Sequence, residues 1–398
     1  MVGANDDPIS RALKNYKELT DTMSELRTKF APLRNWGKGG SNDAITTTTT
    51  TTSNELPDPA VREGIPVIDI SPLTGSDADL KAATIKAIAT ACKEIGFMVV
   101  TGHGVNREVV EGMWEVTTEF FDLSLEEKMK YADMSEEYPY GYEKGEVLSA
   151  GKDKEKGETV ERQPDYKETF TIGPDNLESG MPARILPDDP PTMAAKYTEY
   201  YAAMEGLAST LLKAFAVALE LEENWFEDKI DHHLCALRAL NYPSQVGNPP
   251  KPGQTRAGAH TDYGSLTILK SGGPGLEVRK DVDTSGSDAT WVPVPHVPDA
   301  FVINLGDLMK RWTNDRWSST LHRVVNPPSD GKDNRRQSVA FFHNVNGDAV
   351  VETIDSCRDE AGGSNYDPIV AKEFLMMKHL ASVKNVIEGE TEGVKEEL

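Results

Sequence analysis

Apolar residues recur at spacings of three and four through much of the first half of the chain, which predicts amphipathic helices. This spacing is found in residues 7–30, 79–95, 107–121 and 193–221. Ser124 opens a capping box that begins a further, shorter helix. Residues 65–70 and 96–100 have instead the length and composition of strands. This α/β arrangement alone fits many folds.

The pattern changes in the second half to short strands separated by turns that contain Gly and Pro. The predicted strands are residues 237–242, 257–269, 276–279, 291–294, 300–304, 322–325 and 337–342. Strands spaced in this way are typical of a sandwich or jelly roll. We therefore expect a mixed α/β chain with an all-β core flanked by helices, the last of which opens at Asp367.

Other segments show neither the helical nor the strand pattern of apolar residues. Residues 35–59 are rich in Gly, Ser, Asn and Thr, which favours a flexible linker, although the tract Thr46 to Thr52 also fits a poly-threonine strand. Residues 133–192 are expected to form a long irregular loop. The predicted organisation is a helical extension (1–34), a linker (35–59), an α/β region (60–190), a long helix with the jelly-roll core (191–352), and a C-terminal helix with an acidic tail (353–398).

The charge and composition of the chain limit the kinds of partner that it is expected to bind. A formal net charge of −23 argues against nucleic acid, whose phosphates carry the same sign. No apolar run approaches the roughly 18 residues that span a bilayer, and the N-terminus does not resemble a signal peptide. The three scattered cysteines are expected to be buried, free thiols. We expect a soluble, cytoplasmic protein; its oligomeric state stays open, with the N-terminal helix as one candidate contact.

His260 and Asp262 stand two apart within a segment rich in strand-forming residues. Side chains two apart on a strand project from the same face, so we expect the imidazole and the carboxylate to converge. His322 begins a later predicted strand and is a candidate for a third ligand. Two histidines and one carboxylate form the facial triad that binds Fe(II) and leaves positions open for other ligands.

Arg336 and Ser338 also stand two apart on one predicted strand. A guanidinium beside a hydroxyl suits a carboxylate, and Tyr242 could add a phenolic hydroxyl. Together these residues describe an iron centre with a dicarboxylic acid beside it. Taken singly, each pair also fits an ordinary structural role, such as a surface salt bridge. The order of all these residues on strands of one β region is what favours a site.

Several motifs run in the order found in a known family: Ile65-Pro66-Val67-Ile68-Asp69, Gly96-Phe97, His103-Gly104-Val105, Asn241-Tyr242-Pro243, His260-Thr261-Asp262, His322-Arg323-Val324 and Arg336-Gln337-Ser338. Over roughly residues 60–350 the chain resembles the isopenicillin N synthase-like superfamily of Fe(II)/2-oxoglutarate oxygenases. The resemblance implies a distorted double-stranded β-helix, or jelly-roll, core.

The same resemblance implies roles for particular residues. Iron is expected at His260, Asp262 and His322. 2-Oxoglutarate is expected at a group made of Arg336, Ser338, Tyr242 and the adjacent Asn241. Dioxygen is the implied oxidant.

Weaker candidates for contact with the substrate share strand faces with these residues or resemble pocket-edge positions of the family. They are Tyr142, Lys167, Arg238, Arg256, Phe342 and Asn344. For Arg238 and Arg256, either a structural carboxylate or an acidic substrate would neutralise an inward charge. Of the remaining histidines, for which structural roles are expected, His343 is the strongest candidate for an exception because it follows the Arg336 strand.

Three functions fit these observations. The first is a 2-oxoglutarate-dependent dioxygenase that oxidises an unactivated C–H bond of a small metabolite, a carboxylate-bearing one being a candidate, by hydroxylation, desaturation or ring closure, with release of succinate and CO2. The second is an isopenicillin N synthase-type cyclase that uses O2 without 2-oxoglutarate. The third is a non-catalytic ligand-binding jelly roll. The first is the function we expect, and its substrate is left open.

Overall fold

The computed structural model describes residues 64–132, 140–144, 146, 163–175, 184, 186–280, 290–328 and 330–379. The predicted N-terminal helix, the linker with its threonine tract and the acidic tail lie outside these residues. The boundaries of the predicted regions therefore stay predictions. Among the helices that the structure describes, none combines the length and the apolar composition needed to cross a membrane.

The larger of two facing sheets has eight strands in the order β1-β2-β10-β7-β12-β5-β4-β3. Its strands are β1 (Val67–Asp69), β2 (Phe97–Thr101), β3 (Gly141–Lys144), β4 (Glu168–Ile172), β5 (Ala236–Tyr242), β7 (Leu266–Ser271), β10 (Phe301–Leu305) and β12 (Arg336–His343). Only β1 and β2 pair in parallel within it. We call this the major sheet.

The minor sheet has four strands in the order β6-β11-β8-β9. They are β6 (Ala257–His260), β8 (Leu276–Lys280), β9 (Thr290–Pro293) and β11 (His322–Val324). Side chains from both sheets meet in a buried apolar cluster that includes Leu240, Tyr242 and Ala340 from the major sheet and Val278 from the minor one. Two facing antiparallel layers with helices outside confirm the predicted jelly-roll core.

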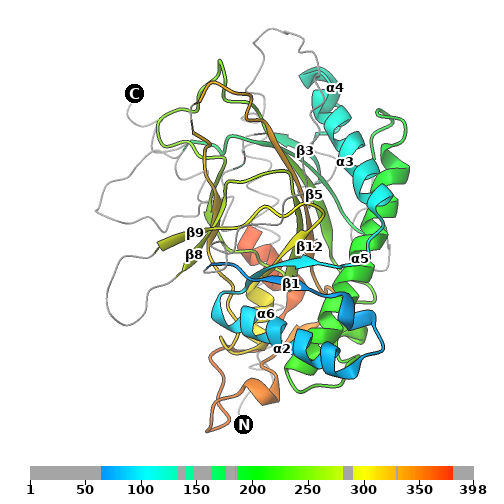
Figure 1. Cartoon of the computed structure of the whole chain (residues 1–398), viewed down its shortest axis with the longest axis vertical. Coiled ribbons are helices and arrows are strands. Elements are labelled where there is room, and N and C mark those ends of the chain that lie inside the picture. The colour runs from blue at the N-terminus through cyan, green and yellow to red at the C-terminus, as the bar shows by residue number, and fades with distance from the viewer. Residues whose placement is uncertain are drawn as a thin grey trace, which may run out of the picture.

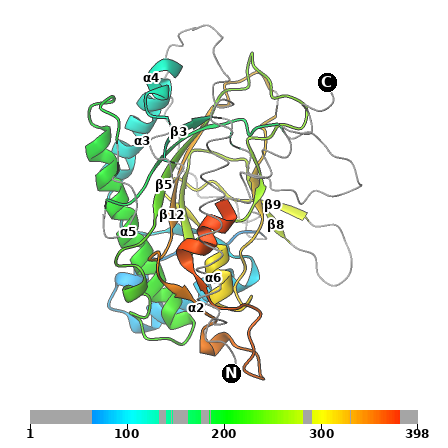
Figure 2. The ribbon, with the colours of Figure 1, turned by 180° about the vertical axis from the view of Figure 1, so that it is seen from behind.

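Helices cover the other face of the major sheet, as Figures 1 and 2 show from opposite sides. They are α2 (Ala78–Glu94), α3 (Arg107–Asp122), α4 (Leu125–Met129) and α5 (Met193–Ala218). The predicted capping box is present at α4, where Ser124 Oγ accepts a hydrogen bond from the Glu127 amide at 3.2 Å. The period of α5 places Tyr197, Met204 and Leu211 against the sheet, where all three are fully buried.

The remaining elements are short and are spread along the described chain. They are the short helix α6 (Asp307–Trp312), the hairpin of β13 (Val350–Val351) with β14 (Ile369–Val370), and the 3-10 turns η3 (Ser71–Thr74), η5 (Glu227–Lys229) and η6 (Asp355–Cys357). The last helix begins at residue 371 rather than at the predicted Asp367, because Ile369–Val370 pair with β13, and it is described to residue 379. All three cysteines are buried free thiols, as predicted.

Two predictions about the elements were wrong. Residues 257–269 form not one strand but β6 and β7, because the chain turns between them. Gly264 packs so tightly on Gly306 there that a Cβ on Gly306 would lie 2.2 Å from the Gly264 carbonyl oxygen. The expected loop 133–192 contains β3 and β4, which extend the major sheet beyond β5. Helix α6 was not predicted.

Candidate active site

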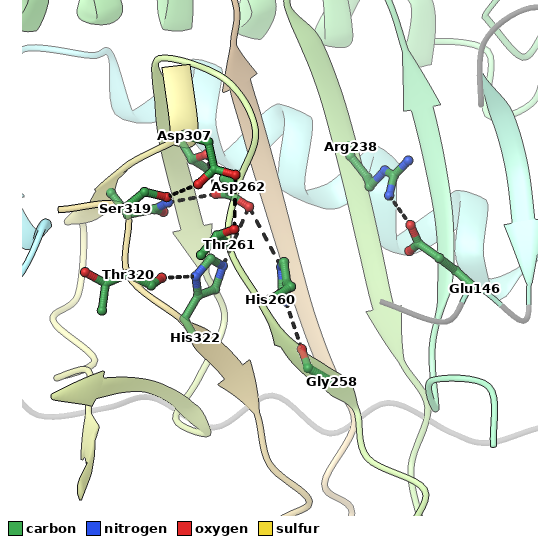
Figure 3. A network of polar contacts seen from close by, with 12 residues as sticks. Glu146, Arg238, Gly258, His260, Thr261, Asp262, Asp307, Ser319, Thr320 and His322 are labelled. Carbon is green, nitrogen blue, oxygen red and sulfur yellow. Dashed lines mark hydrogen bonds and ion pairs between the residues drawn. The ribbon is translucent and has the colours of Figure 1, made fainter. Parts of the chain in front are cut away.

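His260 and His322 face each other across neighbouring strands of the minor sheet. β6 and β11 pair antiparallel with His322 opposite His260, and the two ring centroids lie 4.3 Å apart. His260 Nδ1 donates to the Gly258 carbonyl oxygen at 2.8 Å, and His322 Nδ1 donates to the Thr320 carbonyl oxygen at 3.1 Å (Figure 3). Because a carbonyl oxygen only accepts, each Nδ1 carries the hydrogen. Each Nε2 therefore keeps a free lone pair.

Asp262 completes this arrangement from the turn after β6. Its Oδ1 lies 3.8 Å from His260 Nε2 and 3.7 Å from His322 Nε2, beyond hydrogen-bond distance. Its Oδ2 accepts hydrogen bonds from Thr267 Oγ1 at 2.5 Å and from Asn304 Nδ2 at 2.7 Å. These bonds, rather than the pleat of a continuous strand, fix the carboxylate so that Oδ1 points to the two imidazoles.

The donor set fits a divalent transition metal. The three ligand atoms lie within 4.8 Å of one another. Burial, reinforced by the neighbouring His322, lowers the pKa of His260 to about 4, so its imidazole is neutral near pH 7. Burial alone would raise the pKa of Asp262, but His322, His260 and the hydrogen bonds from Asn304 and Thr267 together lower it. Two imidazoles and one carboxylate match the facial triad of Fe(II) oxygenases.

Arg336 lies on the inner face of β12, opposite Tyr242 of β5. It is 4% exposed, and its guanidinium donates to Ser271 Oγ at 2.8 Å and Ser338 Oγ at 3.4 Å. The Tyr242 ring centroid lies 5.1 Å from the guanidinium carbon. Burial lowers the pKa of Arg336, and no carboxylate of the described residues forms an ion pair with it. A buried guanidinium in this state requires an anion.

Asn241 lies on the opposite face of β5 from Tyr242. Its Nδ2 donates to Glu168 Oε1 at 2.7 Å, and its Oδ1 accepts from Arg335 Nε at 2.8 Å. The structure therefore gives Asn241 a contact with structural charges, whereas the sequence prediction grouped it with Arg336.

Three of the predicted substrate residues engage carboxylates of the chain itself. Tyr142 donates its hydroxyl to Glu168 Oε2 at 2.5 Å. Lys167 pairs with Glu146 and Asp165, and Arg238 pairs with Glu146 at 2.9 Å. The structural alternative for Arg238 is thus the one observed.

The other three candidates differ from one another. Arg256 is 3% exposed; it donates to the Asn334 carbonyl oxygen, and its Nε has no hydrogen-bond partner in the described chain. Phe342 packs against the apolar cluster between the sheets, on the Arg336 face. Asn344 lies beyond β12 and donates to the Leu234 carbonyl oxygen at 2.9 Å.

His343 is not part of this site. It lies on the helix-facing side of β12, where Ser265 Oγ is 2.8 Å from its Nδ1 and the His233 ring is 5.8 Å away between centroids. Sequence reasoning missed Thr267 and Asn304 as partners of Asp262. Their only signal was their position in predicted strands near the site.

Comparison with known proteins agrees with this geometry. Residues 65–193 match the family model described as non-haem dioxygenase in morphine synthesis N-terminal, and residues 234–345 match that of the 2OG-Fe(II) oxygenase superfamily. The chain belongs to the 2OG-Fe(II) oxygenase superfamily. It is a non-haem dioxygenase that depends on Fe(II) and 2-oxoglutarate and consumes O2, which confirms the resemblance inferred from the sequence.

Individual relatives align over nearly their whole length. The 2-oxoglutarate-Fe(II) type oxidoreductase hxnY of Emericella nidulans is 31% identical over 84% of this chain and 93% of its own. A homoarginine-6-hydroxylase of Oryza sativa subsp. japonica is 32% identical, and the alignment covers 80% of this chain and 98% of that protein. A Neurospora crassa protein crystallised with alpha-KG superposes with a TM-score of 0.70 at 29% identity, covering 81% of this chain and 98% of that one.

Proposed function

We propose that this enzyme oxidises an unactivated C–H bond of a small molecule at an iron held by His260, Asp262 and His322. The observation that carries the proposal is the convergence of two imidazole Nε2 atoms and Asp262 Oδ1 within 4.8 Å, with every other polar atom of the three side chains hydrogen-bonded elsewhere. When bound, Fe(II) and 2-oxoglutarate supply the oxidation: O2 and 2-oxoglutarate are consumed, succinate and CO2 are released, and the C–H bond is oxidised.

The chain's own residues orient the reactants. We propose that Arg336 neutralises the far carboxylate of 2-oxoglutarate, with Ser338 and the Tyr242 hydroxyl as further hydrogen-bonding groups. The buried, carboxylate-free environment of Arg336 supports this role. The carbonyl oxygens of Gly258 and Thr320 hold both imidazoles in the tautomer that offers Nε2.

The proposed substrate is a small metabolite rather than a nucleic acid. Relatives carry the names homoarginine-6-hydroxylase and validamycin A dioxygenase, and the Neurospora crassa protein was also crystallised with thymine. A net charge of −23 disfavours a polyanionic partner. Arg256 supports a substrate that carries a carboxylate, because its buried guanidinium has no carboxylate partner among the described residues. Hydroxylation, desaturation and ring closure all begin with the same C–H oxidation.

The test is an anaerobic titration of the metal-free protein with Fe(II) and then with 2-oxoglutarate, followed by the weak visible charge-transfer band of the chelate. We expect the band to saturate at a single equivalent in the wild type and to be absent from His260→Ala. His232→Ala is the matched control, because the His232 ring forms its hydrogen bonds with Asp231 and Asp348 in a partly exposed position. A band retained in His260→Ala would refute the assigned ligands. Succinate release then provides the screen for substrates.

A further inference from the structure

The proposed iron ligand His260 lies on a short strand that has a neighbouring strand on one side only. β6 has four residues and lies at the edge of the minor sheet, so it pairs with β11 alone. The ladder aligns His260 with His322 and Ala257 with Val324, and its register shifts between these pairs. Gly258 lies in that irregular stretch and, as a glycine, has the widest backbone freedom of any residue. The carbonyl group that orients His260 thus belongs to a residue in the irregular part of an edge strand.

A segment before β4 lies along the free edge of β6. The Tyr166 amide donates to the Thr255 carbonyl oxygen at 2.8 Å, and the Gly258 amide donates to Asp165 Oδ1 at 3.1 Å. Asp165 is 6% exposed. Gly258 is therefore held on both sides of its Cα: its amide by Asp165, and its carbonyl oxygen by the His260 ring.

Asp165 is in turn fixed by a chain of alternating charges that are buried or half-buried. Lys167 Nζ lies 3.0 Å from Asp165 Oδ2 and 2.9 Å from Glu146 Oε2. The other oxygen of Glu146 lies 2.9 Å from Arg238 Nη1 on β5 of the major sheet. Figure 3 shows Glu146 directed at Arg238. Two carboxylates and two cations balance, so burial leaves no uncompensated charge.

We infer that Asp165 is a positioning residue for the metal site: it holds Gly258 so that the Gly258 carbonyl oxygen keeps His260 Nε2 directed at the iron. The inference rests on the proposed function, since it presumes that His260 is a ligand. It also gives the ion pairs of Lys167, Glu146 and Arg238 a role in addition to stability. They connect the edge of the minor sheet to the major sheet. Outer partners of metal-binding histidines typically change metal affinity by 10–100-fold when removed.

The test measures metal affinity without turnover. Full-length apoprotein is titrated with Mn(II), whose free ion gives an EPR signal that binding suppresses. We expect Asp165→Ala to weaken Mn(II) binding about tenfold or more, and Asp165→Asn, which keeps an acceptor oxygen for the Gly258 amide, to weaken it only about threefold. Lys167→Met should also weaken it about threefold, because it frees the Asp165 side chain to rotate.

Lys128→Met is the control. Lys128 forms an equally buried ion pair with Glu168 at 2.9 Å, behind β4 and without contact to β6. It should lower stability while leaving Mn(II) affinity within about twofold of the wild type. The inference is overturned if Asp165→Ala binds Mn(II) as tightly as the wild type, or if Lys128→Met weakens binding as much as Asp165→Ala. Should Asp165→Ala not fold, unchanged affinity in both Asp165→Asn and Lys167→Met overturns it. A wild type that binds no Mn(II) refutes instead the proposed function.

Discussion

The two sheets hold their functional side chains in different ways. In the major sheet, Arg336 stands on β12, an eight-residue strand that pairs with β5 on one side and β7 on the other. In the minor sheet, the two histidines stand on strands of four and three residues. One of those strands is an edge with a shifted register.

Because of this difference, substitutions in the two sheets should affect different quantities: the free energy of unfolding in the major sheet and metal affinity in the minor sheet. Strand β12 is fixed by ladders on both sides from Ser338 onward and by a helical layer, so changes to its buried residues act first on the free energy of unfolding. The metal ligands depend on individual side-chain contacts, such as those of Thr267 and Asn304 with Asp262. Changes there should act first on metal affinity.

His322→Ala should produce the largest effect. It removes one of the three converging donor atoms, and we expect stoichiometric Fe(II) binding and succinate formation to fall below detection. The apoprotein should lose only about 1–2 kcal/mol of unfolding free energy, because His322 makes one hydrogen bond, to the Thr320 carbonyl oxygen, and packs on Phe97. Iron titration and urea unfolding measure the two quantities. A variant that still bound iron tightly would contradict the assigned site.

Phe341→Ala, on the major sheet, should have the opposite effect: it should lower stability and leave metal binding unchanged. Phe341 is fully buried on the helix-facing side of β12, with its ring centroid 5.0 Å from that of Tyr201. We expect a loss of about 3–5 kcal/mol in unfolding free energy. Mn(II) affinity of the folded variant should be unchanged. Phe342→Ala, on the opposite and less buried face, should cost about half as much. Equal costs for the two variants would count against the assigned faces.

Arg336→Gln should weaken 2-oxoglutarate without affecting iron. Removing one member of a buried charge pair costs about 2–5 kcal/mol, which is roughly thirtyfold or more in Kd. Intensity of the charge-transfer band against 2-oxoglutarate concentration gives the Kd, and the preceding Fe(II) titration gives the control. Arg335→Gln is the matched variant, because Arg335 is partly exposed and pairs with Asp122. A similar loss in both variants would contradict the assignment.

Much of the fold followed from the period of the apolar residues. The long helix α5 and strand β12 were predicted within a few residues because each has one strongly apolar face. Strand β4 was missed although Thr169 to Ile172 alternate polar and apolar residues, because this short run lies in a segment otherwise rich in Gly, Pro and charged residues. The break between β6 and β7 depends on the contact of Gly264 with Gly306, forty-two positions along the chain, which no local pattern encodes.

The candidate site was predictable to the extent that it uses residue pairs two apart. His260 with Asp262, and Arg336 with Ser338, could be read from spacing and order. Asp165 could not, because its partner is a backbone amide 93 positions away. A structural carboxylate was one of the two predicted partners of Arg238, but its identity as Glu146 could not be predicted, because Glu146 lies in a segment that shows no periodic pattern.

The pH dependence caused by His343 is the smallest predicted effect, and it tests whether the two faces of β12 have different roles. Burial lowers the pKa of His343 to about 3, whereas an unfolded chain has a histidine pKa of about 6.5. Below pH 6.5 the unfolded state therefore takes up a proton that the folded state does not, so the stability contributed by the neutral ring is complete above that pH and falls as the pH drops towards 3. At pH 5 we expect a loss on the order of 2 kcal/mol. Urea unfolding at pH 7.5 and pH 5 should show this loss in the wild type and a smaller one in His343→Asn, which accepts no proton. Since the ring faces the helices rather than Arg336, the 2-oxoglutarate Kd of this variant at pH 7.5 should match that of the wild type, and a raised Kd would place His343 in the site after all.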